Sequence, residues 1–257
     1  NVLYPASHAL TYSDLQLGTV PWIVPIYALT RNPVLAYHLT LYIGFVLCAL
    51  GFCRLVQSWT GSTFAGVVTG LASILAPYRM TGLGLLYLHF LVYIPVAFLC
   101  VDAIVAGRRP WRLAVVLLAA LVLQSASSGY LAYVTFVVVF VHAAMTAWEA
   151  PSPQRARAVG TLLAVGVVAA AAIAALYLPF AQHAAAGAFG AAGSDRSQYN
   201  PWMVVFWTIP GRNLWQNGVG GLGAPLVVVA AIGLMNRGVR GWATAVPSVV
   251  AGAILTL

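Results

Sequence analysis

Long runs of apolar residues, broken by short polar or charged segments, extend along almost the whole chain. A membrane-spanning helix needs about 20 mostly apolar residues, and the breaks between the runs predict about eight such helices. Strands of a membrane barrel alternate apolar and polar positions over about 10 residues. The runs in this chain are unbroken and show no such alternation. We therefore expect an all-α, polytopic transmembrane helix bundle. The predicted spans cover residues 34–55, 64–76, 89–106, 113–123, 130–147, 160–179 and 222–235, and an eighth begins at Trp242.

Residues 1–33 differ from the spans because prolines interrupt them and only their second half is apolar. Within this segment, residues 15–29 predict a short helix that lies at the membrane interface. Trp22 and Tyr27 favour that depth, since aromatic side chains with a polar atom collect where the bilayer meets water. We interpret residues 1–33 as an extracytoplasmic loop with an interfacial helix.

Residues 34–257 predict the helix bundle itself, with no second, soluble domain. Its longest polar segment, at residues 182–221, is expected to be an outward loop. The polar residues 124–129 are expected to join two spans as a tight antiparallel hairpin, and residues 149–158 to form a solvent loop. The span at 64–76 is rich in small residues, which indicates close packing against neighbouring helices.

Composition supports the membrane class, because 62% hydrophobic and only 6% charged residues cannot cover the surface of a water-soluble globule. The three cysteines lie in apolar runs without metal-binding spacing, so we interpret them as packing residues. The chain begins with Asn1 in a polar and aromatic sequence and ends inside an apolar run. We therefore expect both termini to be truncated, with at least one helix before residue 1.

The net charge of +8 comes entirely from arginine, since the chain contains no lysine. In a soluble protein this excess would suggest nucleic acid, whereas in a membrane protein it reports topology and anionic headgroups. Cytoplasmic loops retain positive charge, so the helix ends that hold most arginines are predicted to be cytoplasmic. Those ends hold Arg54, Arg108, Arg109, Arg112, Arg155, Arg157, Arg237 and Arg240.

This orientation places most of the chemically capable side chains on the opposite, outward face. Asp14 is the only acidic residue among the first hundred, and ionisable residues near membrane depth tend to be functional. The other outward candidates are Arg79, His89, Tyr130, His183, Asp195 and Arg196.

Each candidate also has a purely structural interpretation. Asp14 is suited to cap the helix that starts near Leu15, and Arg79 to bind a lipid headgroup at a helix end. His89 fits an interfacial histidine as well as a phosphate or metal ligand, because no second histidine lies at metal-binding spacing. Asp102, His38 and His142 are assigned to structure, since the two histidines have no ionisable neighbour at helical spacing.

Several enzyme classes lack their sequence motifs here, including GxSxG hydrolases, P-loop enzymes and dinucleotide-binding enzymes. The motifs that are present resemble the GT-C class of polytopic bacterial glycosyltransferases. The similar segments are a first outward loop with Ser13-Asp14, then Arg31-Asn32-Pro33, Ala76-Pro77-Tyr78-Arg79, Leu88-His89 and Ser127-Ser128-Gly129-Tyr130. The resemblance covers roughly residues 5–135.

The resemblance implies an enzyme that moves a sugar from a polyprenyl-phosphate carrier to an extracytoplasmic acceptor. It implies Asp14 as the catalytic base, or as a ligand with His89 and Asp195 if a divalent metal ion is used. Arg79 and Arg196 would bind the leaving phosphate, with His89 and Tyr130 as further substrate contacts. Many members carry paired acids in this loop, and this chain has one.

The implied partners are the lipid-linked sugar donor, membrane lipids and a glycan, lipid or protein acceptor, with no nucleic acid. The implied location is the bacterial cytoplasmic membrane, with the active face outward. A transporter or lipid flippase without covalent chemistry is the alternative, as is a structural membrane subunit. Transporters place polar groups near the bilayer midplane, whereas the polar residues here gather at one face, which favours an enzyme.

Overall fold

The computed structural model describes residues 15–75, 86–108 and 110–185, and every regular element in these ranges is helical. The predicted all-α class is therefore confirmed for this part of the chain. The predicted spans at 222–235 and from Trp242 lie outside it. Of the outward loop predicted at 182–221, residues 182–185 belong to α9, and the rest lies outside the described residues. The elements are η2 (Leu17–Thr19), α1 (Val20–Thr30), α2 (Pro33–Thr60), α3 (Thr63–Leu75), α5 (Leu86–His89), α6 (Tyr93–Val105), α7 (Pro110–Ser127), α8 (Gly129–Glu149) and α9 (Ser152–Ala185).

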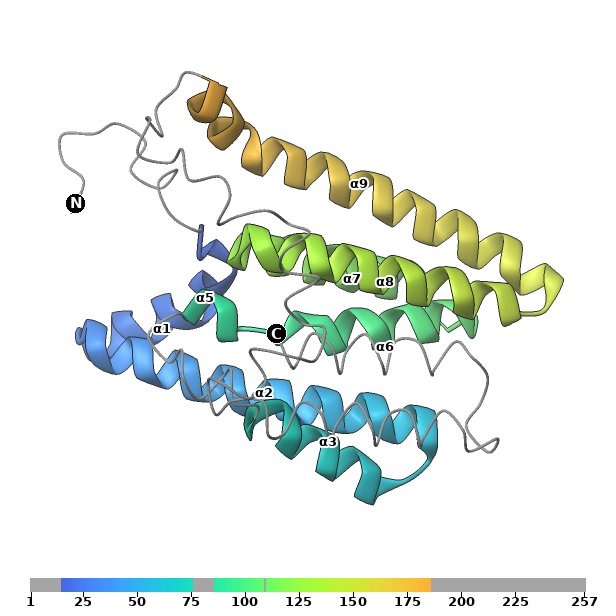
Figure 1. The fold of residues 1–257 in the computed structure, drawn as a ribbon, viewed down its shortest axis with the longest axis horizontal. Helices are drawn as coiled ribbons and strands as arrows, with labels where there is room; N and C mark the ends of the chain where they lie inside the picture. Colours follow the sequence, from blue (N-terminus) through green and yellow to red (C-terminus); the bar gives the residue numbers. More distant parts are fainter. Residues whose placement is uncertain (1–14, 76–85, 109, 186–257) are drawn as a thin grey trace, which may run out of the picture.

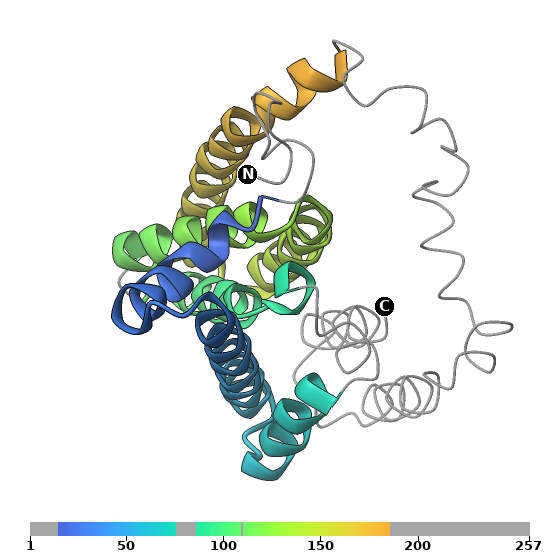
Figure 2. The same cartoon turned by 90° about the vertical axis from the view of Figure 1, so that its left-hand side faces the viewer.

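Successive long helices run in opposite directions, so the bundle has two distinct ends (Figure 1). One end holds η2, α5 and the start of α8, and we call it the α5 end; Figure 2 is viewed from this side. The opposite end holds the last turns of α2, α6 and α8, and we call it the basic end. Five described arginines lie there: Arg54, Arg108, Arg112, Arg155 and Arg157.

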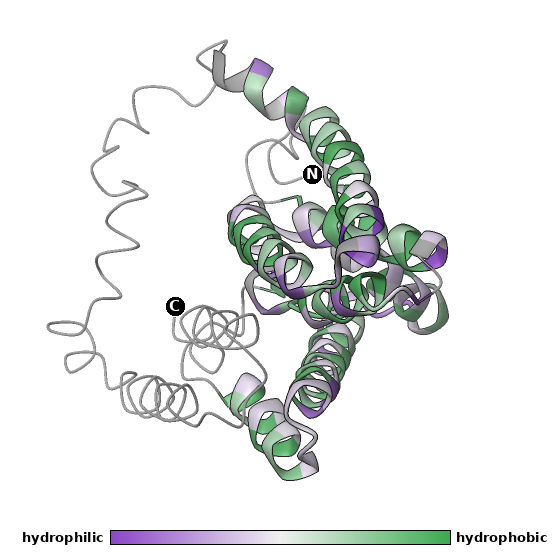
Figure 3. Cartoon of the chain, turned by 90° about the vertical axis from the view of Figure 1, so that its right-hand side faces the viewer, coloured by the Kyte–Doolittle hydropathy of each residue, from purple (hydrophilic) through white to green (hydrophobic). Residues whose placement is uncertain are grey.

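Three of the described helices are long and apolar enough to cross a membrane, over Pro33–Thr60, Leu131–Glu149 and Pro153–Pro179. Only 11% of the most apolar window of the last one is buried, so α9 presents a largely apolar surface suited to contact with lipid. Figure 3 is viewed from the side of the basic end and shows hydrophobic residues along the helix bodies. The chain is therefore a helical membrane protein.

Helix α2 has sequence signals at both ends that define its bounds. Asn32 accepts hydrogen bonds at its side-chain oxygen from the backbone N–H groups of Val34 and Leu35, at 3.0 and 3.1 Å. Pro33, at the first helical position, has no N–H that would need a partner. Gly61 ends the helix with φ of 70°, and its N–H bonds the Gln57 carbonyl, the usual role of glycine there.

Several predicted boundaries were wrong. Helix α2 continues through Thr60, five residues beyond the predicted end at Leu55. Residues 124–127, expected in the hairpin connection, form the last turn of α7, so that Ser128 alone joins α7 to α8. The hydroxyls of Ser125 and Ser127 donate to the carbonyls of the preceding turn, at 2.8 and 2.9 Å, which lets polar residues remain helical. The segment 149–158 is mostly helix as well, because α9 begins at Ser152.

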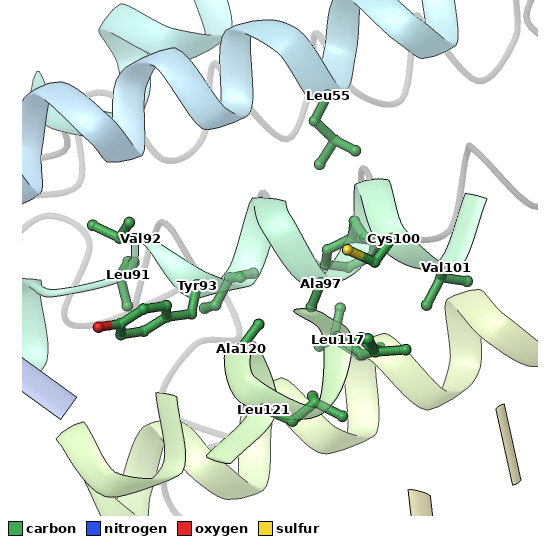
Figure 4. Close-up of a cluster of buried hydrophobic side chains, with 14 of the residues drawn as sticks. Leu55, Leu91, Val92, Tyr93, Ala97, Cys100, Val101, Leu117, Ala120 and Leu121 are labelled. Carbon is green, nitrogen blue, oxygen red and sulfur yellow. The ribbon is translucent and has the colours of Figure 1, made fainter. Parts of the chain in front are cut away.

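The predicted span at 89–106 is interrupted. Helix α5 ends at His89, and α6 begins at Tyr93. From there α6 lies in the middle of the bundle, and its side chains make up much of the hydrophobic core between α2 and α7 (Figure 4). Ala97 and Val101 are completely buried.

Close packing of α3 on α2 depends on glycine, as the small residues of 64–76 predicted. A β-carbon on Gly66 would lie 2.5 Å from the Cys53 carbonyl oxygen, and one on Gly70 would lie 2.6 Å from that of Ala49. Both distances are too short for any side chain, so glycine is what allows the two backbones to touch.

Gly66→Ala should therefore separate α3 from α2 and lower the free energy of unfolding by about 1–3 kcal/mol. Thermal unfolding of the purified protein in detergent measures the effect. Gly160→Ala is the matched control, because nothing lies within 4 Å of a β-carbon at that helical position. Equal melting temperatures for the two variants would contradict the proposed packing.

Candidate functional site

The structure places two of the sequence-predicted site residues, both at the α5 end. His89 is the last residue of α5, and Tyr130 lies in the first turn of α8 (Figure 1). The remaining predicted site residues lie outside the described part of the chain: Asp14, Arg79, Asp195 and Arg196. Their convergence with His89 stays a prediction.

His89 is built into the interior. Its side chain is 1% exposed, and its ring meets the Phe45 ring of α2 edge-on, with centroids 6.0 Å apart. Beyond His89 the chain leaves the helix, and the Phe90 carbonyl accepts a hydrogen bond from the Gln124 side chain at 3.2 Å. A ligand of His89 would therefore have to enter the bundle, between α2 and the end of α7.

Gln124 is the clearest polar group that sequence reasoning did not assign to the site. Its side chain is completely buried, and in the part of the chain that the structure describes its Oε1 atom has no hydrogen-bond partner. A buried polar atom without a partner is uncommon. This oxygen can accept a hydrogen bond from a ligand or water. The sequence signal was present, since Gln124 opens the polar segment that precedes α8.

The start of α8, which carries Tyr130, is held between α7 and α9. The Tyr177 hydroxyl of α9 donates to the Ser125 carbonyl of α7 at 2.7 Å. The same hydroxyl would lie 3.1 Å from a β-carbon on Gly129. Ser127 and Ser128 are completely buried, so this end of the bundle has a polar interior despite its apolar surroundings.

The segment that follows Asp14 in sequence is attached to the same place. Leu15 is buried, and Gly18 packs so tightly on α7 that a β-carbon would overlap the Leu123 carbonyl and the Ser127 hydroxyl. The Tyr93 hydroxyl donates to the Gly18 carbonyl at 2.7 Å and accepts from the Trp22 ring N–H at 3.0 Å. These contacts fix residues 15–19 on the last turn of α7.

The polar groups at the α5 end are mostly neutral among the described residues. Both described carboxylates, Asp102 and Glu149, lie in the half of the bundle near the basic end. Arg31, after α1, is the arginine near the α5 end in the described ranges. The described groups at this end therefore supply hydrogen bonds and shape, and neither described carboxylate lies among them.

A second polar cluster lies near the basic end. His142 of α8 has no ionisable neighbour at helical spacing, but its Nε2 lies 2.6 Å from Oδ1 of Asp102 on α6. Oδ2 of the same carboxylate accepts from the Trp59 ring N–H of α2 at 2.8 Å. Helical spacing within one helix says nothing about partners on another. His38, by contrast, bonds only the Val34 carbonyl of its own helix among the described contacts.

This Asp102–His142–Trp59 cluster connects three helices. The His142 side chain is 1% exposed and the Asp102 side chain 27% exposed, and the His142 ring packs on Phe98 with centroids 4.8 Å apart. Asp102 lies one turn before the end of α6. Its contacts match the structural role predicted for Asp102 and His142.

No group of three or more metal-ligating side chains occurs among the described residues. His89 is the one predicted ligand in those ranges. The divalent metal ion that the sequence allowed therefore stays a prediction.

Comparison with protein-family models, curated proteins and solved structures gave no match to this chain.

Removing one partner of the Asp102–His142 pair should destabilise the protein, because it leaves a buried polar group without its bond. A double-mutant cycle of Asp102→Ala and His142→Ala, followed by thermal unfolding, is expected to give a coupling energy of about 1 kcal/mol. Glu149→Gln, at an exposed carboxylate of the same end, should change stability by less than about 0.5 kcal/mol. A coupling energy of zero would refute the pair.

Proposed function

We propose that the protein is a membrane glycosyltransferase that moves a sugar from a polyprenyl-phosphate carrier to an extracytoplasmic acceptor. The active site is at the α5 end, and this end faces outward from the bacterial cytoplasmic membrane. Its partners are the lipid-linked donor, membrane lipids and a glycan, lipid or protein acceptor. The residues that resemble the GT-C class and the concentration of arginine at the opposite end support this assignment.

The observation that carries the proposal is the attachment of residues 15–19 to the last turn of α7. A peptide bond joins Asp14 to Leu15, whose side chain is buried there, and consecutive Cα atoms are about 3.8 Å apart. The segment that follows the candidate base in sequence is therefore fixed at the same end as His89, Gln124 and the start of α8. We propose the site at this end because catalysis depends on position.

The proposed reaction is an inverting transfer. The Asp14 carboxylate takes the proton of the acceptor hydroxyl while the oxygen of that hydroxyl attacks the anomeric carbon of the sugar. The bond from the anomeric carbon to the phosphate oxygen breaks at the same time. The carrier phosphate leaves with the bonding electrons. Arg79 and Arg196 bind the phosphate, because the guanidinium fork matches its oxygens.

The described polar groups would orient the substrates. The Gln124 Oε1 atom can accept a hydrogen bond from a sugar hydroxyl, while His89 and Tyr130 are further contacts for sugar or phosphate. If a divalent cation takes part, Asp14, His89 and Asp195 would hold it, and it would neutralise charge on the phosphate. The exposed apolar surfaces of α2 and α9 give the lipid chain of the donor a surface to lie on.

A transporter or lipid flippase remains the alternative function. Such proteins place ionisable groups near the bilayer midplane. In the described ranges, the Asp102–His142 pair lies toward the basic end, and the remaining buried polar groups are concentrated at the α5 end. This distribution favours the enzyme.

Asp14→Asn should lower sugar transfer by about a hundredfold or more, since a general base contributes 10²–10⁴ in rate. Arg79→Ala and His89→Gln should lower it as well. The assay measures transfer of radiolabelled sugar from extracted lipid-linked donors by the full-length protein. Glu149→Gln, near the basic end, is the matched control away from the proposed site and should retain activity. Wild-type transfer by all three site variants would rule the site out, and movement of lipid without transfer would favour a flippase.

Gly18→Ala tests the attachment of the segment that follows Asp14. The added methyl group has no space against Leu123 and Ser127, so the segment must move and transfer activity should fall at least about tenfold. The melting temperature should change less than in Gly66→Ala, because η2 is a peripheral element. Full activity in Gly18→Ala would separate this segment from catalysis.

A further inference from the structure

A cavity of about 370 Å³, open to the surface, lies between α2 and α6 near the basic end, apart from the candidate functional site. It is lined by Arg54, Gln57 and Ser58 of α2 and by Leu99 of α6. The three α2 residues have the spacing i, i+3 and i+4, so they share one face of the helix. We propose that this cavity binds the phosphate group of an anionic membrane phospholipid.

The charge of Arg54 has no counterpart in the described part of the chain. The ion pair of His142 and Asp102 does not include Arg54, and the Arg54 guanidinium makes a long hydrogen bond, of 3.4 Å, to Gln57 Oε1. Arg54 is exposed, and its remaining N–H groups can bind two phosphate oxygens together. An exposed guanidinium with free N–H groups can bind an anion.

Gln57 holds that arginine in place. Its Oε1 accepts from Arg54, while its Nε2 donates to the Thr63 hydroxyl at the start of α3, at 3.0 Å. The Ser58 hydroxyl donates to the Leu55 carbonyl at 2.7 Å. Its oxygen can still accept a hydrogen bond from a hydroxyl of a glycerol headgroup. Leu99 adds an apolar wall. The lining therefore offers a cation, a hydroxyl and an apolar contact, which matches a phospholipid headgroup where it joins its acyl chains.

The depth of the cavity favours a lipid over a soluble anion. Helix α2 has 28 residues and is roughly 42 Å long, against about 30 Å for the hydrocarbon core and 40–45 Å with the headgroup regions. Its ends therefore reach the headgroups. Arg54 precedes the last residue, Thr60, by roughly 9 Å along the axis, which places its long side chain near the phosphate layer.

The test uses the full chain in detergent, titrated with phosphatidylglycerol, with phosphatidylcholine or with inorganic phosphate, and native mass spectrometry to measure bound lipid. Arg54→Gln should weaken phosphatidylglycerol binding about tenfold, as expected for a lost charge-assisted contact. Arg108→Gln, an exposed arginine of the same end that does not line the cavity, should weaken it less than twofold. Arg54→Lys should be intermediate, because lysine keeps the charge and loses the fork.

Leu99→Trp is the second variant, because the larger side chain narrows the cavity without changing any charge. It should also weaken phosphatidylglycerol binding, and thermal unfolding in detergent without added lipid shows whether each variant is folded. Equal weakening by Arg54→Gln and Arg108→Gln would show diffuse attraction and overturn the proposal. Inorganic phosphate that competes at millimolar concentration would point to a soluble anion, and unchanged binding by Leu99→Trp would exclude the cavity.

Discussion

Helix α6 is held by side-chain hydrogen bonds near both of its ends. At the α5 end, Tyr93 bonds the Gly18 carbonyl and the Trp22 ring N–H. Near the basic end, Asp102 bonds Trp59 and His142. Apolar packing alone gives little preference for one helix register over another in lipid, because lipid tails are as apolar as leucine side chains. These two sets of polar contacts therefore set the position of α6, and α2, α7 and α8 pack around it.

The two ends of α6 differ in the chemistry they present. The contacts of Tyr93 belong to a neutral polar interior that includes Gln124, Ser127 and His89. Those of Asp102 belong to an end that carries arginines and both described carboxylates. The charged residues of the proposed site, Asp14, Arg79, Asp195 and Arg196, lie outside the described residues. The arginines of the other end are suited to lipid phosphates, so the two proposals assign different roles to the two ends.

The sequence predicted the fold best where one helix determines its own structure. The span predicted at 34–55 lies within α2, and the small residues of 64–76 predicted the close packing that Gly66 and Gly70 make with that helix. The prediction failed at residues 90–92, where the chain leaves the helix although Phe90, Leu91 and Val92 are as apolar as their neighbours. It failed again at 124–127, because a run of serine and glutamine is typical of a loop between helices. In the structure, Ser125 and Ser127 donate to carbonyls of the preceding helical turn, and Gln124 donates to the Phe90 carbonyl.

Part of the candidate site was predictable from the sequence, and part was visible only in the tertiary structure. The sequence alone determined that the chain is a helical membrane protein, since composition and run length leave no other way to bury so many apolar residues and satisfy the backbone. It also selected His89 and Tyr130, which the structure places at one end of the bundle. Only the tertiary structure decided that Asp102 pairs with His142, that Gln124 lies in the polar interior and that Gly18 seats the first segment on α7. The residues joined by these contacts are separated in sequence by between 34 and 109 positions. The sequence could not predict them, because apolar periodicity specifies which face of a helix is buried but not which helix that face meets.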